Sequence, residues 1–171
     1  MANFIHNVGS GGGFFSTKRV VTWSTSLNGL ASGSRAISDT TADTGLFSQS
    51  SFSSAPYGTA FFTTVTTGWT PTPGGTFACW FLQSTDGGTT FEVESRTTPT
   101  ATVPAVARAP DFLIPVYTGG TAISAGDILF AQNPFPIPYL SCKLIVQNMT
   151  GANLAAQAHT LTIAGLADTY A

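Results

Sequence analysis

Apolar and polar residues alternate along much of the chain with the period of two that is typical of β-strands. Residues 76–84 (TFACWFLQS) are the most apolar segment, and the alternation there leaves apolar side chains on both faces. A strand of this kind lies in the centre of a covered sheet or contacts another subunit. In residues 139–148 the alternation predicts an amphipathic strand with one apolar face: Leu140, Cys142, Leu144 and Val146.

Shorter runs of the same alternation predict further strands at residues 19–25, 34–38, 59–67, 111–117, 127–132 and 159–165. Asp86-Gly87-Gly88 is turn chemistry, and it predicts a hairpin whose second strand is residues 89–94. Pro115 predicts an edge or bulged position for its strand. Three prolines in residues 133–138 remove backbone donors, so we expect no sheet pairing there.

About seven to nine short strands without any helical period predict an all-β protein with a single antiparallel β-sandwich. A jelly roll and another Greek-key arrangement fit equally well. Residues 1–17 are rich in glycine and predict a flexible N-terminal arm, which leaves residues 18–171 as the sandwich domain. The arm also holds apolar side chains, so it is either a frayed terminus or a segment that orders on another subunit.

The amino-acid composition argues against several classes of function. The 171 residues include 43% hydrophobic and only 8% charged residues, with a net charge of −2. No run of Lys or Arg is present that could neutralise phosphates, which argues against nucleic-acid binding. The apolar runs are far shorter than the roughly 20 residues of a membrane helix, and the first residues lack the pattern of a signal peptide. We therefore expect a soluble protein that is not exported, with much of its uncharged surface covered by neighbouring chains.

Candidate catalytic groups are few. His6 lies in the arm and His159 begins a strand, so spacing supports no Ser/His/Asp triad. Asp86, Glu92 and Glu94 cluster near the predicted hairpin, where paired carboxylates could hydrolyse a sugar. The solvated end of a hairpin is the simpler interpretation, with Asp86 bonding nearby backbone N–H groups. The sequence therefore predicts no catalytic residue.

Metal and ligand sites are equally poorly supported. Cys79 and Cys142 lie on predicted inward faces, without the spacing of a zinc site or a cofactor motif, and we interpret them as buried thiols. Tryptophan rings could stack on sugars if exposed. Trp23 and Trp80 lie in strands and are expected to pack, whereas Trp69 precedes a proline turn and is the candidate for exposure.

Three segments together resemble a widespread family of small bacteriophage virion proteins that are encoded among the head and tail genes. They are residues 26–34 (SLNGLASGS), residues 73–91, which contain CWFLQSTDGGTTF, and residues 143–154 (KLIVQNMTGANL). The resemblance covers roughly residues 20–165 in order, and residues 1–17 and 133–138 are not matched. It implies a β-sandwich virion component without an enzymatic site, in first place a capsid decoration or cement protein.

Such proteins commonly form symmetric oligomers, often trimers, that clamp neighbouring capsid subunits. We therefore expect as partners further copies of the chain and the major capsid protein, on particles assembled in the bacterial host cytoplasm. A closed ring hides apolar surface by symmetry. The alternatives are a tail or baseplate component and a carbohydrate-binding or receptor-binding module. Candidate interface residues come from the arm, the two-sided strand and the proline-rich segment: Phe4, Ile5, Phe14, Phe15, Trp80, Leu82, Phe135 and Ile137.

Overall fold

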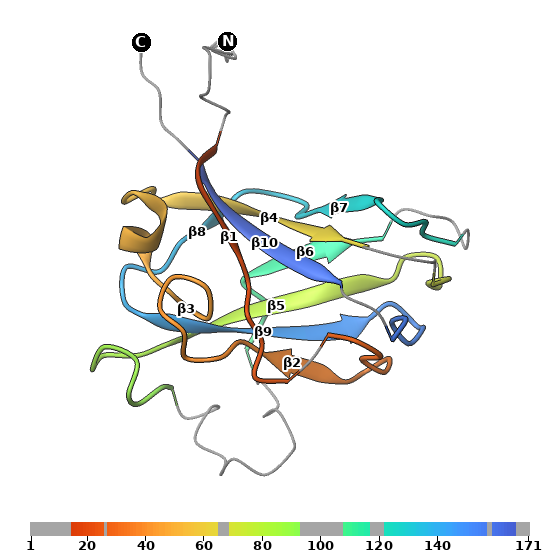
Figure 1. Cartoon of the computed structure of the whole chain (residues 1–171), viewed down its shortest axis with the longest axis horizontal. Coiled ribbons are helices and arrows are strands. Elements are labelled where there is room, and N and C mark those ends of the chain that lie inside the picture. Colours follow the sequence, from red (N-terminus) through yellow and green to blue (C-terminus); the bar gives the residue numbers. More distant parts are fainter. Residues whose placement is uncertain are drawn as a thin grey trace, which may run out of the picture.

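A computed structural model describes residues 15–25, 27–64, 69–92, 108–116, 122–156 and 159–166. In this part of the chain the elements are short β-strands and one 3-10 helix, η1 (Gln49–Phe52). The strands form two antiparallel sheets, in the upper and lower halves of the view in Figure 1. The predicted all-β sandwich is thereby confirmed, and the choice between a jelly roll and another Greek key stays a prediction.

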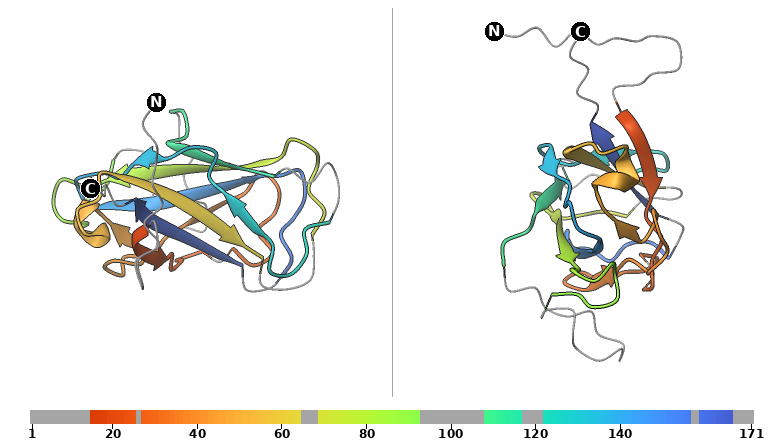
Figure 2. Two further views of the ribbon diagram at one scale, coloured as in Figure 1. Left: turned by 90° about the horizontal axis from the view of Figure 1, so that it is seen from above. Right: turned by 90° about the vertical axis from the view of Figure 1, so that its left-hand side faces the viewer.

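The first sheet has the order β1-β10-β4-β7. Figure 2 (left) looks onto it, with the four strands in that order. A short strand, β8, pairs with β4 beside β7. The bounds are β1 (Phe15–Val20), β10 (Thr160–Leu166), β4 (Tyr57–Thr63), β7 (Ile128–Phe130) and β8 (Phe135–Pro136).

The second sheet has the order β2-β9-β5-β6, and β3 pairs with β9. Its centre is the long pairing of β5 with β9, which lie side by side in Figure 1. The edge position of β6 agrees with the prediction from Pro115. The bounds are β2 (Arg35–Ile37), β9 (Cys142–Met149), β5 (Thr76–Gln83), β6 (Phe112–Pro115) and β3 (Leu46–Phe47).

The main core lies between the sheets and is rich in aromatic rings. Phe62 of β4 stacks on Phe77 of β5, with 4.5 Å between ring centroids. Phe112 of β6 stacks on Phe135 of β8 at 3.9 Å. These contacts join the two sheets, and each ring is close to fully buried. Stacked and edge-to-face aromatic pairs add to the stabilisation from buried apolar area.

Four details of the predicted strands are wrong. β1 begins at Phe15, so residues 15–17 belong to the sheet and not to an arm. Residues 89–92 form no strand after the Asp86 turn, although the backbone N–H of Glu92 bonds the carbonyl of Gln83 at 3.1 Å. On this edge β6 pairs only with residues 76–79 of β5. The Phe81 N–H and carbonyl further along the edge are bonded by the side chains of Asp111 and Arg108 instead of by a strand.

The other two corrections concern residues 133–140. Phe135–Pro136 pairs with β4, because Phe135 supplies the donor that its proline neighbours lack and β8 stays at the sheet edge. Leu140 is 40% exposed and does not join the inward face, since it precedes the first residue of β9. The remaining inward residues of that strand, from Cys142 to Val146, are buried as predicted.

Candidate interaction surface

The outward side of the first sheet carries rows of side chains that cross its strands. Because Phe62 and Leu161 point into the core, alternation turns their neighbours outward. The central row joins residues that are direct cross-strand partners: Val20, Thr162, Phe61 and Phe130. The rows on either side are Thr160, Thr63 and Ile128, and Lys18, Ala164 and Thr59. We call these ten residues the open face, in which Lys18 carries the only charge and Ala164 is itself fully buried.

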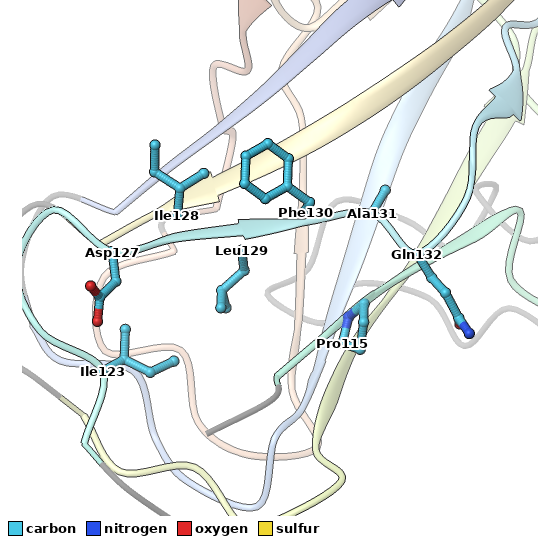
Figure 3. A pocket seen from close by; sticks show the side chains of 8 residues that line it. All are labelled: Pro115, Ile123, Asp127, Ile128, Leu129, Phe130, Ala131 and Gln132. Carbon is cyan, nitrogen blue, oxygen red and sulfur yellow. The ribbon is translucent and has the colours of Figure 1, made fainter. Parts of the chain in front are cut away.

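The open face leaves large apolar groups in contact with solvent. Val20, Ile128 and Phe130 have exposed fractions of 52%, 50% and 54%. In Figure 3, Ile128 and Phe130 project from one side of β7 and Leu129 from the other. The Phe130 ring stands edge-on against Phe61, with 5.1 Å between centroids. Exposed apolar side chains that gather on one face of a sheet indicate a candidate interaction site.

A groove of about 430 Å³ continues the apolar surface past β7. Ile123 and Leu129 line it from the core side (Figure 3). Its one carboxylate, Asp127, accepts a hydrogen bond from the backbone N–H of Ser124 at 2.7 Å and so serves a turn. The backbone N–H of Gln132 bonds the carbonyl of Leu113 at 2.9 Å and ties the end of β7 to β6. The groove therefore adds contact area that is about half polar, and no reactive centre among the described residues.

The outward side of the second sheet is different, because the chain covers it. Trp80 and Leu82 of β5 and Ile145 of β9 form a second apolar cluster, over which Phe91 packs. The indole N–H of Trp80 donates to the carbonyl of Arg108 at 3.0 Å. We call this cluster, with the residues 84–92 and 108–111 that lie beside it, the covered face.

Two charged side chains, Arg108 and Asp111, fix the 108–111 segment to β5, and we call this pair the clip. The carboxylate of Asp111 accepts from the backbone N–H of Phe81 at 2.6 Å and from the Arg108 guanidinium at 2.7 Å. Arg108 also donates to the carbonyl of Phe81 at 2.6 Å. The carboxylate of Glu92 lies 3.8 Å from the Arg108 guanidinium. Hydrogen bonds that involve ionised partners are the stronger kind, so the clip holds the cover in place.

The structure places four of the interface residues predicted from the sequence inside the chain. Trp80, Leu82, Phe135 and Ile137 have exposed fractions of 5%, 0%, 2% and 2%. They pack inside the chain and have no surface to offer a partner, so as interface residues they were predicted wrongly. Phe4, Ile5 and Phe14 lie outside the described residues. Phe15 begins β1, and its side chain is likewise not described.

The residues that replace them in the open face were missed. Phe130 and Ile128 belong to a strand of three residues, too short for alternation to assign its faces from the sequence. Val20 lies in a predicted strand, but its register against Thr162 could not be read from the sequence. The alternation in residues 59–67 did separate Phe61 from Phe62. This alternation was the one signal in the sequence that could have located part of the open face.

The tryptophans offer no sugar-stacking platform. Trp69 is 4% exposed, so its predicted exposure is wrong. Its ring packs edge-on against Phe62 and Phe77, with its indole N–H 3.4 Å from the Thr64 hydroxyl. Trp80 belongs to the covered face, and Trp23 is half-buried against the main core.

The titratable candidates that the structure describes serve the fold, and His6 and Glu94 lie outside the described residues. His159 stacks on Phe62 at 5.5 Å, its Nε2 lies 3.1 Å from the Ala155 carbonyl, and burial lowers its pKa. Backbone hydrogen bonds, that from Thr90 foremost, hold the pKa of Asp86 well below its usual value, and Asp86 thus serves the turn as predicted. Cys79 and Cys142 are free and buried, and burial raises both thiol pKa values.

The segment of residues 143–154, one of the three on which the family resemblance rests, has a role inside the chain. The side-chain amide of Asn148 donates to the carbonyls of Leu30 and Ala152 at 2.9 and 2.8 Å. Its oxygen accepts from the backbone N–H and the hydroxyl of Thr150. A Cβ at Gly151, whose φ is 78°, would collide with Thr72. This segment therefore builds a surface turn that is held by the buried side chains of Asn148 and Thr150.

Within the described residues no group of three or more His, Cys, Asp or Glu is placed to hold a metal ion. The same part of the chain contains no helix long and apolar enough to span a membrane. No protein-family model, curated protein or solved structure matches the chain.

Proposed function

We propose that the protein is a structural component of a bacteriophage particle, a decoration or cement protein of the capsid, and that it acts by contact and not by catalysis. The observation that carries the contact role is the open face. Val20 and Phe130 lie at opposite ends of its central row, each about half exposed, with no charge between them. The phage setting comes from the resemblance in residues 20–165.

The proposed mechanism is stabilisation by mass action. Any surface that binds the assembled shell and not its separated subunits shifts the equilibrium towards the shell. Apolar contact supplies about 25 cal/mol for each Å² of apolar surface removed from water. On this proposal the chain forms a symmetric oligomer, which the resemblance implies is often a trimer, and bridges subunits of the major capsid protein.

The same contact role would suit a tail or baseplate component, which differs in its place on the particle. Trp69, the best candidate for a ring that stacks on a sugar, is buried, which weakens the carbohydrate-binding alternative. The polar side chains of the open face are four threonines and Lys18, and no tryptophan lies among them. We therefore retain the structural proposal.

The experiment that tests this function locates the protein on particles. Virions of the phage that encodes the chain are purified by density gradient, the chain is quantified by mass spectrometry, and immunogold labelling shows its position. We expect many copies per particle, with label over the head. Label confined to the tail would replace the capsid role with the tail alternative. Particles without the chain would overturn the proposal.

A further inference from the structure

We propose that the open face is a self-association surface whose occupant is the open face of a second copy of this chain. The inference deepens the proposed function by assigning one surface to one partner. Its structural basis is the pair of sheet faces: the described residues cover the apolar cluster of one and leave Val20, Ile128 and Phe130 of the other about half exposed. The partner follows from the charge and the area of the open face.

Charge favours a second copy as the partner. Val20, Phe61, Phe130 and Ile128 offer a partner no ionised group, so an acidic or basic surface gains nothing by binding there. Two copies of the face meet without like-charge repulsion in the central row. With a two-fold axis along the strands, β1 of one copy lies over β7 of the other, and the two Lys18 side chains lie at opposite edges.

The shape of the face also fits a copy of itself. Threonine and apolar side chains are mixed in its rows, and two such faces can pack at the spacing of about 10 Å found between packed sheets. The edge-on contact of Phe130 with Phe61 holds the largest projecting ring in place before binding. An anchor that is already ordered loses less entropy on association.

Area decides how strong the contact is. Four strands spaced about 4.8 Å apart and a β4 of seven residues give a face of about 450 Å². A standard interface buries about 800 Å² on each partner, so the open face alone belongs to the weak class. We expect dissociation constants of tens of micromolar or weaker in solution. Copies held side by side on a particle would associate more fully, because their effective concentration is higher.

Sedimentation velocity of the full chain from about 1 µM to about 1 mM tests the inference. We expect a concentration-dependent dimer, because a face that packs on its own copy about a two-fold axis closes at two chains. Val20→Lys places a charge in the central row and should raise the dissociation constant at least about tenfold. Met149→Lys is the matched control, because Met149 is also 52% exposed but lies on the second sheet, and it should leave the constant unchanged.

Folding of each variant is checked by its thermal unfolding midpoint, and Phe130→Ser replaces Val20→Lys if that variant does not fold. A monomer at every concentration would overturn the inference, as would an oligomer that both lysine variants weaken equally or neither weakens. If deleting residues 1–14 converts a monomer into an oligomer, those residues cover the face instead, which also overturns it. Immunogold labelling of particles is independent of these results, so failure here leaves the proposed function separately tested.

Discussion

The two outward faces of the sandwich differ in what covers them. On the second sheet, Trp80 and Leu82 lie beneath residues of the same chain and are at most 5% exposed. On the first sheet, Val20 and Phe130 lie on the surface and are about half exposed. Both faces carry apolar side chains on alternating positions, so the strand pattern alone does not distinguish them.

The comparison shows that a connecting segment can decide which apolar face becomes a surface. The Arg108–Asp111 clip anchors the cover to the backbone of Phe81 by hydrogen bonds of 2.6 Å. The threonines of the open face have no comparable anchor above them in the described structure. An interface therefore cannot be located by apolarity alone, because the most apolar strand, β5, is buried on both sides.

The largest expected effect tests the covered face. Trp80→Ala removes a buried ring and should lower the free energy of unfolding by about 3–5 kcal/mol. Val20→Ala on the open face should change it by less than about 1 kcal/mol, because that side chain is half exposed. Urea denaturation monitored by far-UV circular dichroism measures both. Equal losses in the two variants would abolish the distinction between the faces.

The clip is expected to contribute less than the ring it secures. Asp111→Ala removes the acceptor of the Phe81 N–H and should cost about 1–3 kcal/mol. Hydrogen exchange at the Phe81 amide should speed up in this variant. Asp43→Asn is the control, since it removes only the charge of a 4.0 Å surface ion pair at a residue whose φ of 64° asparagine also tolerates, and it should cost less than about 0.5 kcal/mol. An unchanged Phe81 amide would show that the cover does not need the clip.

A pH titration probes the inner side of the sheet that carries the open face. Burial lowers the pKa of His159 below 6.5, so the unfolded chain takes up the proton first. Stability should therefore be unaffected by this group well above pH 6.5 and should fall as the pH drops below it. His159→Gln should flatten the decline in urea midpoints between about pH 7.5 and 5.5. A decline of the same slope in this variant would assign the effect to another group.

The smallest effect on stability is expected on the open face itself. Phe130→Ser loses one edge-on aromatic contact and should lower the free energy of unfolding by at most about 1.5 kcal/mol. The same change should weaken self-association more than it weakens the fold. A loss of several kcal/mol would mean that Phe130 belongs to the core of the chain. Thermal and urea unfolding of the monomer at low concentration would show this.

The sequence was sufficient to predict the two-sheet fold and insufficient to predict which apolar side chains lie on its surface. The alternation in residues 76–84 correctly separated Phe77, Cys79 and Phe81 from Trp80 and Leu82, because a period of two is a local property. Which of those faces meets solvent depends on residues 108–111, which are distant in sequence. The open face needed the register of Val20 with Thr162 and of Phe61 with Phe130, and register is a property of the folded sheet.

Hydroxyl-radical footprinting tests the central claim most directly, by comparing the isolated chain at low concentration with the chain on assembled particles. The account predicts that oxidation of Phe130 and Ile128 falls several-fold on assembly, while Trp80 is oxidised little in both states. Phe130 and Ile128 oxidised equally in the isolated and assembled chain would contradict the claim that the open face works by contact.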